Sequence, residues 1–298
     1  MTILIKRNHG QKQITLPYSK VLRGVNMQNV LVVQDISCFG KCSTTVALPI
    51  LSHYQMTASI LPTAILSTHT GPEFPGYVFT DLYSHMEATI HHWIDLGLKF
   101  DAIYTGYLGQ AEHVPLLLEM IGNLLHPTGK VFVDPAFGDH GELYSGFDKA
   151  YVEVQKQLIS VSDYIFPNYT EACYLVDKEY RDDCLSPILA QELAEELRAF
   201  GAKNVIMTGV RIKDQIGALM VDDKGYFESY AEFFNQVFHG TGDVFASVFV
   251  GEMMRSNQEQ VALNQATDFV SRAIQMTLED QDPIHYAVHF EKLLGILE

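Results

Sequence analysis

Residues Phe238 to Asp243 combine the residue types that can hold an anion and act on it. Gly240 and Gly242 flank Thr241, Asp243 follows, and small and apolar residues come next. Glycines let the backbone turn tightly, and free N–H groups at the start of the following helix attract negative charge. A carboxylate binds anions poorly, so we interpret Asp243 as a base acting where phosphate charge develops. The alternative is an ordinary glycine turn with Asp243 as the helix N-cap.

Polar, glycine-containing segments also follow the predicted strands. Short apolar runs predict strands at residues 30–33, 59–61, 102–104, 131–133, 164–166 and 205–207. The segments after them are residues 34–40, 67–71, 105–109, 134–139, 167–171 and 208–209. Because ligands of parallel sheets sit beyond the carboxyl ends of the strands, these segments and the 240–243 turn predict one common site.

The elements that must position this site alternate between strand and helix. Helices are predicted at residues 44–54, 81–96, 114–125, 151–159, 170–176, 187–200, 243–255, 259–278 and 285–296, and a hairpin at 216–230. This order predicts an α/β fold with a doubly wound, mostly parallel central sheet and helices on both faces. Residues 27–298 show no internal repeat and are expected to form a single domain. Residues 1–26 carry five basic and no acidic side chains, and we expect them to be a basic N-terminal leader or arm.

The composition narrows the partners that this chain can have. The formal net charge is −16, which argues against binding to nucleic acid or an anionic membrane. Four cysteines in 298 residues do not form a disulfide framework, so a reducing cytoplasm is expected. No apolar run reaches the roughly 18 residues of a membrane span. An anionic substrate would need backbone amides, a few cations and bound metal to offset the acidic charge.

The motifs together resemble a known family. The matching pieces are Gln34 with Phe39-Gly40, Ser67-Thr68-His69-Thr70-Gly71, Thr105-Gly106-Tyr107-Leu108-Gly109, Asp134-Pro135 with Gly138-Asp139, Pro167-Asn168 with Glu171, and Gly240-Thr241-Gly242-Asp243. From about Met27 to its end, the chain resembles the pyridoxal and pyridoxamine kinases (vitamin B6 kinases) of the ribokinase-like superfamily. The resemblance implies a ribokinase-like kinase domain that transfers the γ-phosphoryl group of ATP to the 5′-hydroxymethyl group of pyridoxamine, pyridoxal or pyridoxine.

The resemblance also implies roles for individual residues. Asp243 would accept the proton of the hydroxyl group, while Gly240, Thr241 and Gly242 hold the transferring group. The residues implied in ATP binding are Asp134, Asn168, Thr208, Phe238 and Thr241. Those implied in placing Mg²⁺, through water, are Asp134, Asp139 and Glu171. Without the family pattern, Asp134 would be read as a strand-end cap, and Asn168 with Glu171 as a helix-capping pair. A monovalent cation stays open, and a homodimer is expected by analogy.

On the substrate side the resemblance implies Asp35, His69, Thr70, Tyr107 and Tyr144. The chain departs from the common pattern at Asp35 and Ile36, where many members have Ser followed by His. A carboxylate at position 35 suits a hydrogen bond from a protonated pyridine nitrogen or a ring hydroxyl, or else an amine-bearing vitamer, and on the last of these we expect pyridoxamine to be accepted. The alternatives are a hydroxymethylpyrimidine kinase of the same fold and a non-catalytic ribokinase-like protein that binds a vitamer.

Overall fold

A computed structural model describes residues 2–4, 15–17, 27–71, 73–181, 184–280 and 286–297. Most of the expected arm over residues 1–26 lies outside the described residues. Two short strands within it, β1 (Thr2–Leu4) and β2 (Thr15–Pro17), pair antiparallel. None of the helices in these described ranges combines the length and the apolar character needed to cross a lipid bilayer.

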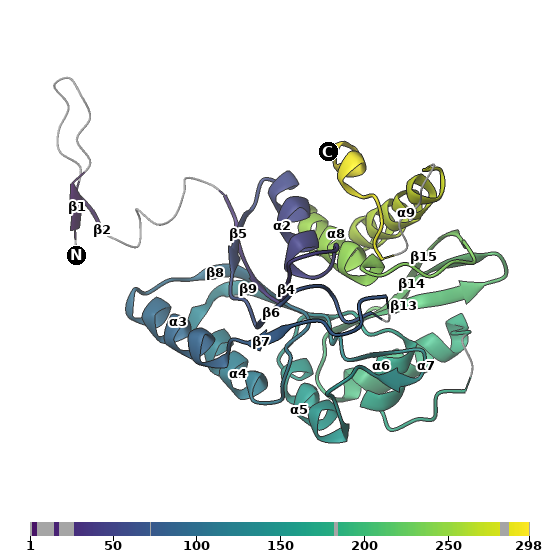
Figure 1. Ribbon diagram of the computed structural model, residues 1–298, viewed down its shortest axis with the longest axis horizontal. Helices are drawn as coiled ribbons and strands as arrows, with labels where there is room; N and C mark the ends of the chain where they lie inside the picture. Colours follow the sequence, from purple (N-terminus) through teal and green to yellow (C-terminus); the bar gives the residue numbers. More distant parts are fainter. Residues whose placement is uncertain are drawn as a thin grey trace.

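The centre of the molecule is an eight-stranded sheet with the order β15-β14-β13-β12-β9-β8-β3-β5 (Figure 1). Neighbouring strands from β13 to β5 run parallel, and β14 and β15 add an antiparallel hairpin at one edge. This confirms the predicted doubly wound, mostly parallel sheet. The strands are β3 (Asn29–Val33), β5 (Thr57–Ile60), β8 (Phe100–Thr105), β9 (Leu125–Val133), β12 (Tyr164–Ile165), β13 (Asn204–Ile212), β14 (Gln215–Val221) and β15 (Tyr226–Glu232).

Helices cover both faces of the sheet because its central strands are apolar on both sides. In β3, Leu31 and Val33 join one buried core while Val30 and Val32 join the other, as the two-residue period of a strand requires. The first core packs under α3 (Tyr83–Asp95), α4 (His113–Leu124), α5 (Lys149–Ile159), α6 (Tyr169–Leu175) and α7 (Pro187–Ala199). The second packs under α2 (Thr44–His53), α8 (Thr241–Ser256), α9 (Glu259–Leu278) and the 3₁₀ helix η1 (Glu291–Ile296) (Figure 1).

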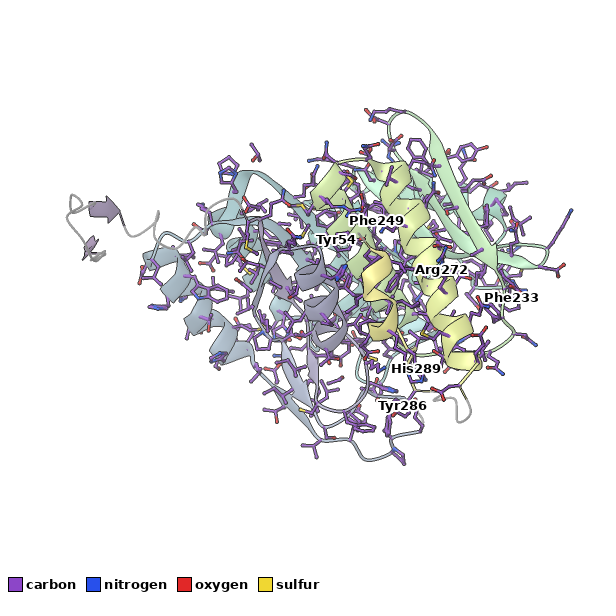
Figure 2. The ribbon with its side chains drawn as sticks, turned by 90° about the horizontal axis from the view of Figure 1, so that it is seen from above. Tyr54, Phe233, Phe249, Arg272, Tyr286 and His289 are labelled. Carbon is purple, nitrogen blue, oxygen red and sulfur yellow. The ribbon has the colours of Figure 1, made fainter. Side chains whose placement is uncertain are left out.

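The second face is held together by close contacts between α2 and α8. A Cβ atom at Gly251 of α8 would lie 2.2 Å from the ring of Tyr54, which directly follows α2, so only glycine lets these helices approach this closely. Figure 2 looks onto this face and labels Tyr54 and Phe249. This packing fixes the position of α8, whose first turn carries the glycines and Asp243.

Besides the β1–β2 pair, two small sheets were not predicted. One joins β4 (Ile36–Ser37), β6 (Ala64–Leu66) and β7 (Phe79–Asp81), and the other pairs β10 (Gly138–Asp139) with β11 (Glu142–Leu143). Residues 67–71 therefore follow β6 of the small sheet, and not the second strand of the main sheet as expected. The last predicted helix is also shorter than expected, because only η1 is helical within residues 286–297.

Candidate active site

A single cavity of about 1150 Å³ lies at the carboxyl ends of the parallel strands. It brings together every residue that the sequence predicted for the site. At one end, which we call the β3 end, it is lined by Asp35, His69, Thr70 and Tyr107. At the other, the β13 end, it is lined by Thr208, Phe238 and residues 233–237. Between and around them lie Asp134, Asp139, Tyr144, Asn168, Glu171, Gly240, Thr241, Gly242 and Asp243.

The glycine turn ends at the start of α8 in a conformation that requires glycine. Gly240 has φ 77° and is the N-cap, and a Cβ atom on it would lie 2.2 Å from the carbonyl oxygen of Lys41. The helix begins at Thr241, two residues earlier than predicted, so the reading of Asp243 as the N-cap is wrong. The backbone N–H groups of the first turn have no partner within the helix and are available to an anion.

Asp243 lies in that first turn with part of its surface open to the cavity. Burial, with a smaller contribution from the nearby carboxylate of Asp35, raises the pKa of its carboxyl to about 7, although the backbone N–H of Ser43 opposes the shift. A carboxyl with a pKa near the working pH suits a general base better than an ordinary aspartate does.

Asp134 and Glu171 form the acidic centre of the cavity. Burial raises the pKa of Glu171 to about 8. It also raises the pKa of Asp134 well above its usual value, with repulsion from Glu171 and Asp243 adding to the effect. A bound cation would relieve this repulsion, and carboxylate oxygens are the ligands that Mg²⁺ prefers. Asp139 is exposed and accepts a hydrogen bond from the N–H of His140 at 2.8 Å. Its carboxylate has further lone pairs with which it could also bind a cation.

Asn168 and Glu171 are the capping pair that the sequence left as an alternative. The side chain of Asn168 accepts from the N–H of Glu171 at 2.9 Å, and the carboxylate of Glu171 accepts from the N–H of Asn168 at 3.0 Å. Glu171 also accepts from the N–H of Phe137 at 2.9 Å. Both carboxylate oxygens therefore accept backbone hydrogen bonds, which fixes the side chain and suits contact with a metal through water better than direct binding.

The β3 end is built around the buried carboxylate of Asp35. Ser37 donates a hydrogen bond to it at 2.9 Å, and burial raises its pKa although Ser43 and Ser37 oppose the shift. The phenol of Tyr107 is half-buried nearby, and its pKa is raised by burial and by Asp35. Thr70 and Tyr144 are exposed at the cavity wall.

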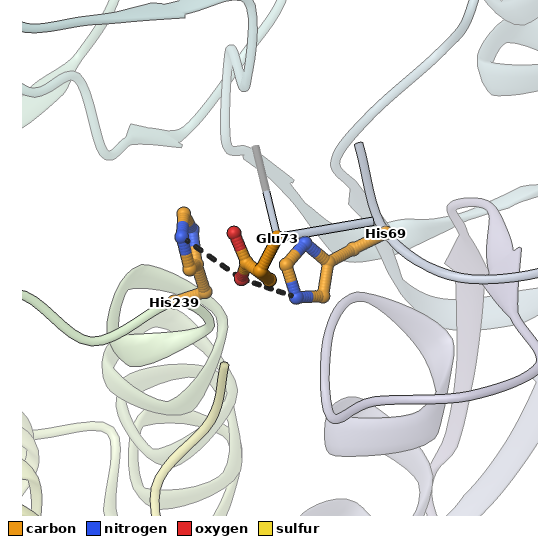
Figure 3. A group of neighbouring side chains, drawn as sticks. All are labelled: His69, Glu73 and His239. Atoms are coloured by element: carbon orange, nitrogen blue, oxygen red, sulfur yellow. Dashed lines mark ion pairs between the residues drawn. The ribbon is translucent and has the colours of Figure 1, made fainter. Parts of the chain in front are cut away.

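Glu73 and His239 were missed by sequence reasoning and lie beside His69. Figure 3 shows Glu73 between the two imidazole rings. Its Oε1 lies 3.2 Å from Nε2 of His69 and 3.3 Å from Nε2 of His239. The ligand atoms of the three residues lie within 4.8 Å of one another, a spacing that a metal ion could use.

The hydrogen bonding of His69 argues against a metal at these residues. The N–H of Gly71 donates to Nδ1 of His69 at 3.0 Å, so Nδ1 carries no proton and Nε2 does. Burial and the neighbouring His239 lower the pKa of His69, which agrees with a neutral ring. Nε2 of His69 therefore carries the proton and lies 3.2 Å from Oε1 of Glu73, four residues further along the chain. Only His239 is distant in the sequence, and no signal there joins it to the other two.

The β13 end has a different character, and most of its residues were not predicted. Phe238 is buried, and Val270 and Ile274 of α9 line the same part of the cavity. β13 continues past Thr208 to Ile212, beyond the predicted end at Met207, with an irregularity at Gly209. Apolar and aromatic side chains of this kind suit the face of a planar base.

Comparisons with known proteins agree with this geometry. The sequence matches the phosphomethylpyrimidine kinase family over residues 83–287. It is 27% identical over 248 residues to a pyridoxal kinase of Dictyostelium discoideum, covering 76% of this chain and 78% of that protein.

Two of the similar solved structures illustrate the shared fold. A protein of Bacteroides thetaiotaomicron, described as a phosphomethylpyrimidine kinase and crystallised with pyridoxal, is 33% identical with a TM-score of 0.85, covering 91% of this chain and 96% of the other. The pyridoxal kinase of Lactobacillus plantarum is 31% identical with a TM-score of 0.83, covering 91% and 97%. The chain therefore belongs to the pyridoxal kinase and phosphomethylpyrimidine kinase family, whose fold is ribokinase-like.

Proposed function

We propose that this kinase transfers the γ-phosphoryl group of ATP to the 5′-hydroxymethyl group of a vitamin B6 compound. The observation that carries the proposal is the position of Asp243, whose pKa is raised to about 7, at the start of α8 in a cavity that also contains Asp35 and Tyr107. The names of the relatives support the same acceptor, since two are pyridoxal kinases and a third was crystallised with pyridoxal.

In this mechanism Asp243 accepts a hydrogen bond from the hydroxyl group and orients it towards the γ-phosphorus. As the new O–P bond forms, the bond from the γ-phosphorus to the bridging oxygen of ADP breaks, and the hydroxyl proton passes to Asp243. The N–H groups at the start of α8 stabilise the charge on the transferring oxygens. Little proton transfer is needed early in a loose transition state, so orientation by Asp243 matters as much as its basicity.

We further propose that Asp134, Asp139 and Glu171 place Mg²⁺ beside the phosphates. When bound, Mg²⁺ would neutralise phosphate charge that seven lining carboxylates would otherwise repel. Asn168 and Thr208 would contact the phosphate chain, and Phe238 would contact the base. These roles agree with the positions of the residues along the cavity wall.

Within the B6 compounds, Asp35 favours pyridoxamine. Asp35 is 4% exposed, and a protonated amine or pyridine nitrogen would supply a charge partner for its buried carboxylate. Thr70, Tyr107 and His69 would line the pocket around the pyridine ring, and Tyr144 would lie at its outer wall.

A hydroxymethylpyrimidine kinase is the second candidate, because the matched family is described by phosphomethylpyrimidine kinase activity. Both candidates use the same chemistry and differ only in the acceptor. A panel assay of ATP consumption separates them, with pyridoxamine, pyridoxal, pyridoxine, hydroxymethylpyrimidine and a sugar as acceptors.

We expect the highest kcat/KM for a B6 compound. A higher kcat/KM for hydroxymethylpyrimidine than for each of the three vitamers would overturn the assignment. Binding of a vitamer with no phosphorylation of any acceptor would establish a non-catalytic binding protein instead.

A further inference from the structure

Arg211 is a cation in a strongly acidic cavity. Among the described residues that line the cavity it is the single lysine or arginine, against carboxylates at Asp35, Asp134, Asp139, Glu142, Glu171, Glu232 and Asp243. A triphosphate brought into this cavity meets negative charge from most directions. A permanent positive charge on the wall is therefore the protein group best suited to attract it.

The side chain of Arg211 is held on an aromatic ring. It lies three positions after Thr208 on β13, and the carbon of its guanidinium group is 3.5 Å from the centre of the Phe233 ring. Phe233 directly follows β15 and is labelled in Figure 2. A guanidinium group that stacks on a ring at this distance keeps its plane, and its N–H groups point outward along the edge.

Arg211 has no anionic partner within the described part of the chain. Its guanidinium group makes no hydrogen bond or ion pair there, and Nε is enclosed without an acceptor. A partly buried donor without an acceptor is unfavourable, and natural proteins rarely keep one without a use. The side chain of Arg211 is therefore suited to bind a ligand whose oxygen atoms accept its hydrogen bonds.

The position of Arg211 on the cavity wall indicates which ligand it would bind. Arg211 belongs to the β13 end, where Thr208 lies on the same strand and apolar residues of α9 offer a surface for a base. The acceptor alcohol would lie at the opposite, β3 end. Resting on the proposed use of ATP, we propose that Arg211 is a nucleotide-binding residue whose guanidinium group grips the phosphate chain, with Phe233 as its support.

The proposal separates phosphate recognition from base recognition, so the test compares ADP with adenosine. Equilibrium binding of ADP and of adenosine to the 298-residue chain is measured for the wild type and for Arg211→Gln. No phosphoryl acceptor, such as a B6 compound, is added. We expect ADP to bind about 10- to 100-fold more weakly to the variant, as for loss of charge-assisted hydrogen bonds, and adenosine to bind equally. Arg211→Lys should recover only part of the loss because an ammonium group lacks the planar fork.

Matched variants separate this role from general effects of charge and folding. Lys213→Gln removes the same charge from the turn of the same hairpin, outside the cavity lining, and should leave ADP binding unchanged. Phe233→Leu keeps the charge but removes the support, and should weaken ADP by a smaller factor. Adenosine binding reports in each variant whether the pocket is intact.

The outcomes distinguish this inference from the proposed function. An unchanged ratio of ADP to adenosine affinity in Arg211→Gln would overturn the role of Arg211, whether both affinities stay the same or both fall by the same factor. Because no acceptor is present, failure of the chain to phosphorylate B6 compounds leaves the binding result intact. A wild type that binds ADP no better than adenosine would remove the phosphate site altogether.

Discussion

The two ends of the cavity are built on opposite principles. The β3 end is polar and crowded, with the buried carboxylate of Asp35, and Glu73 between two imidazole rings. The β13 end combines apolar side chains with the single cation Arg211 among the described lining residues. An aromatic, charged acceptor needs directional contacts, whereas a nucleotide needs a flat surface and positive charge. The comparison teaches that each end can be altered separately, with Asp243 at the point where the two meet.

Replacing Asp243, which lies between the two ends, should have the largest effect on kcat. Asp243→Asn keeps the shape but removes the base, so kcat should fall by about 10²–10⁴ while ADP affinity at the β13 end stays the same. Because burial disfavours the charged carboxyl, the variant should be at least as resistant to urea as the wild type at pH 8. Asp223→Asn, at the tip of the β14–β15 hairpin, serves as the control. Wild-type kcat in Asp243→Asn would remove this residue from the mechanism.

Gly240 and Gly242 test how the turn between the two ends of the cavity is stabilised. Gly240 packs on the carbonyl of Lys41 with a positive φ, so Gly240→Ala should lower the free energy of unfolding by roughly 2–4 kcal/mol. At Gly242 an added Cβ meets open space, so Gly242→Ala should leave stability unchanged or raise it by up to about 1 kcal/mol. Urea denaturation of both variants measures the difference, and equal losses would contradict the geometry.

Much of this architecture could be predicted from the sequence. Apolar runs such as Val30 to Val33 have no polar face, so they had to be strands covered on both sides, and the segments after them meet at one edge. The small sheets could not be predicted, because strands of two or three residues carry too little periodicity. The start of α8 was misplaced because Gly240-Thr241-Gly242 has poor helix propensity, which the tertiary contact with Lys41 overrides.

The residues that sequence reasoning missed share a physical cause. Residues 208–209 were predicted to follow a strand that ends at Met207, yet β13 continues through them, with an irregularity at Gly209, to Ile212. The alternation of Val210, Arg211 and Ile212 was the available signal. Glu73 lies outside the motifs, and His239, which stands in the 238–243 stretch, is brought beside Glu73 only by the folded chain. Local pattern therefore located the site, while its charge partners depended on tertiary contacts.

The pH dependence of kcat/KM sharpens the role of Asp243. A base must be deprotonated, and the pKa of Asp243 is raised to about 7 in the free protein. As pH falls below 7, the fraction of the active form drops, so kcat/KM should decrease by about tenfold per pH unit at saturating metal. Glu171→Gln should remove any inflection near pH 8 and leave the one near 7. A flat profile between pH 5 and 7 would contradict the assignment.

Asp35 tests whether the β3 end sets the choice of acceptor. Asp35→Ser removes the charge that favours an amine, so the ratio of kcat/KM for pyridoxamine to that for pyridoxine should fall by about tenfold, as for loss of one charge-assisted contact. ADP affinity should not change, since Asp35 lies at the far end from Thr208 and Arg211. Glu142→Gln, another carboxylate of the same cavity, is the matched control. An unaltered ratio would show that selectivity lies elsewhere.

Glu73 is expected to give the smallest effect, and the reason separates it from Asp35. Its side chain is 32% exposed and that of His239 is 38% exposed, and ion pairs with such exposure contribute only about 0–1 kcal/mol. Glu73→Gln should therefore raise KM for the acceptor by no more than about fivefold and leave kcat and ADP affinity unchanged. Glu119→Gln, which pairs with His91 on the surface, is the control. A fall in kcat beyond tenfold would mean that Glu73 acts on the reacting atoms through His239, and the β3 end could no longer be treated as separate from the transfer step.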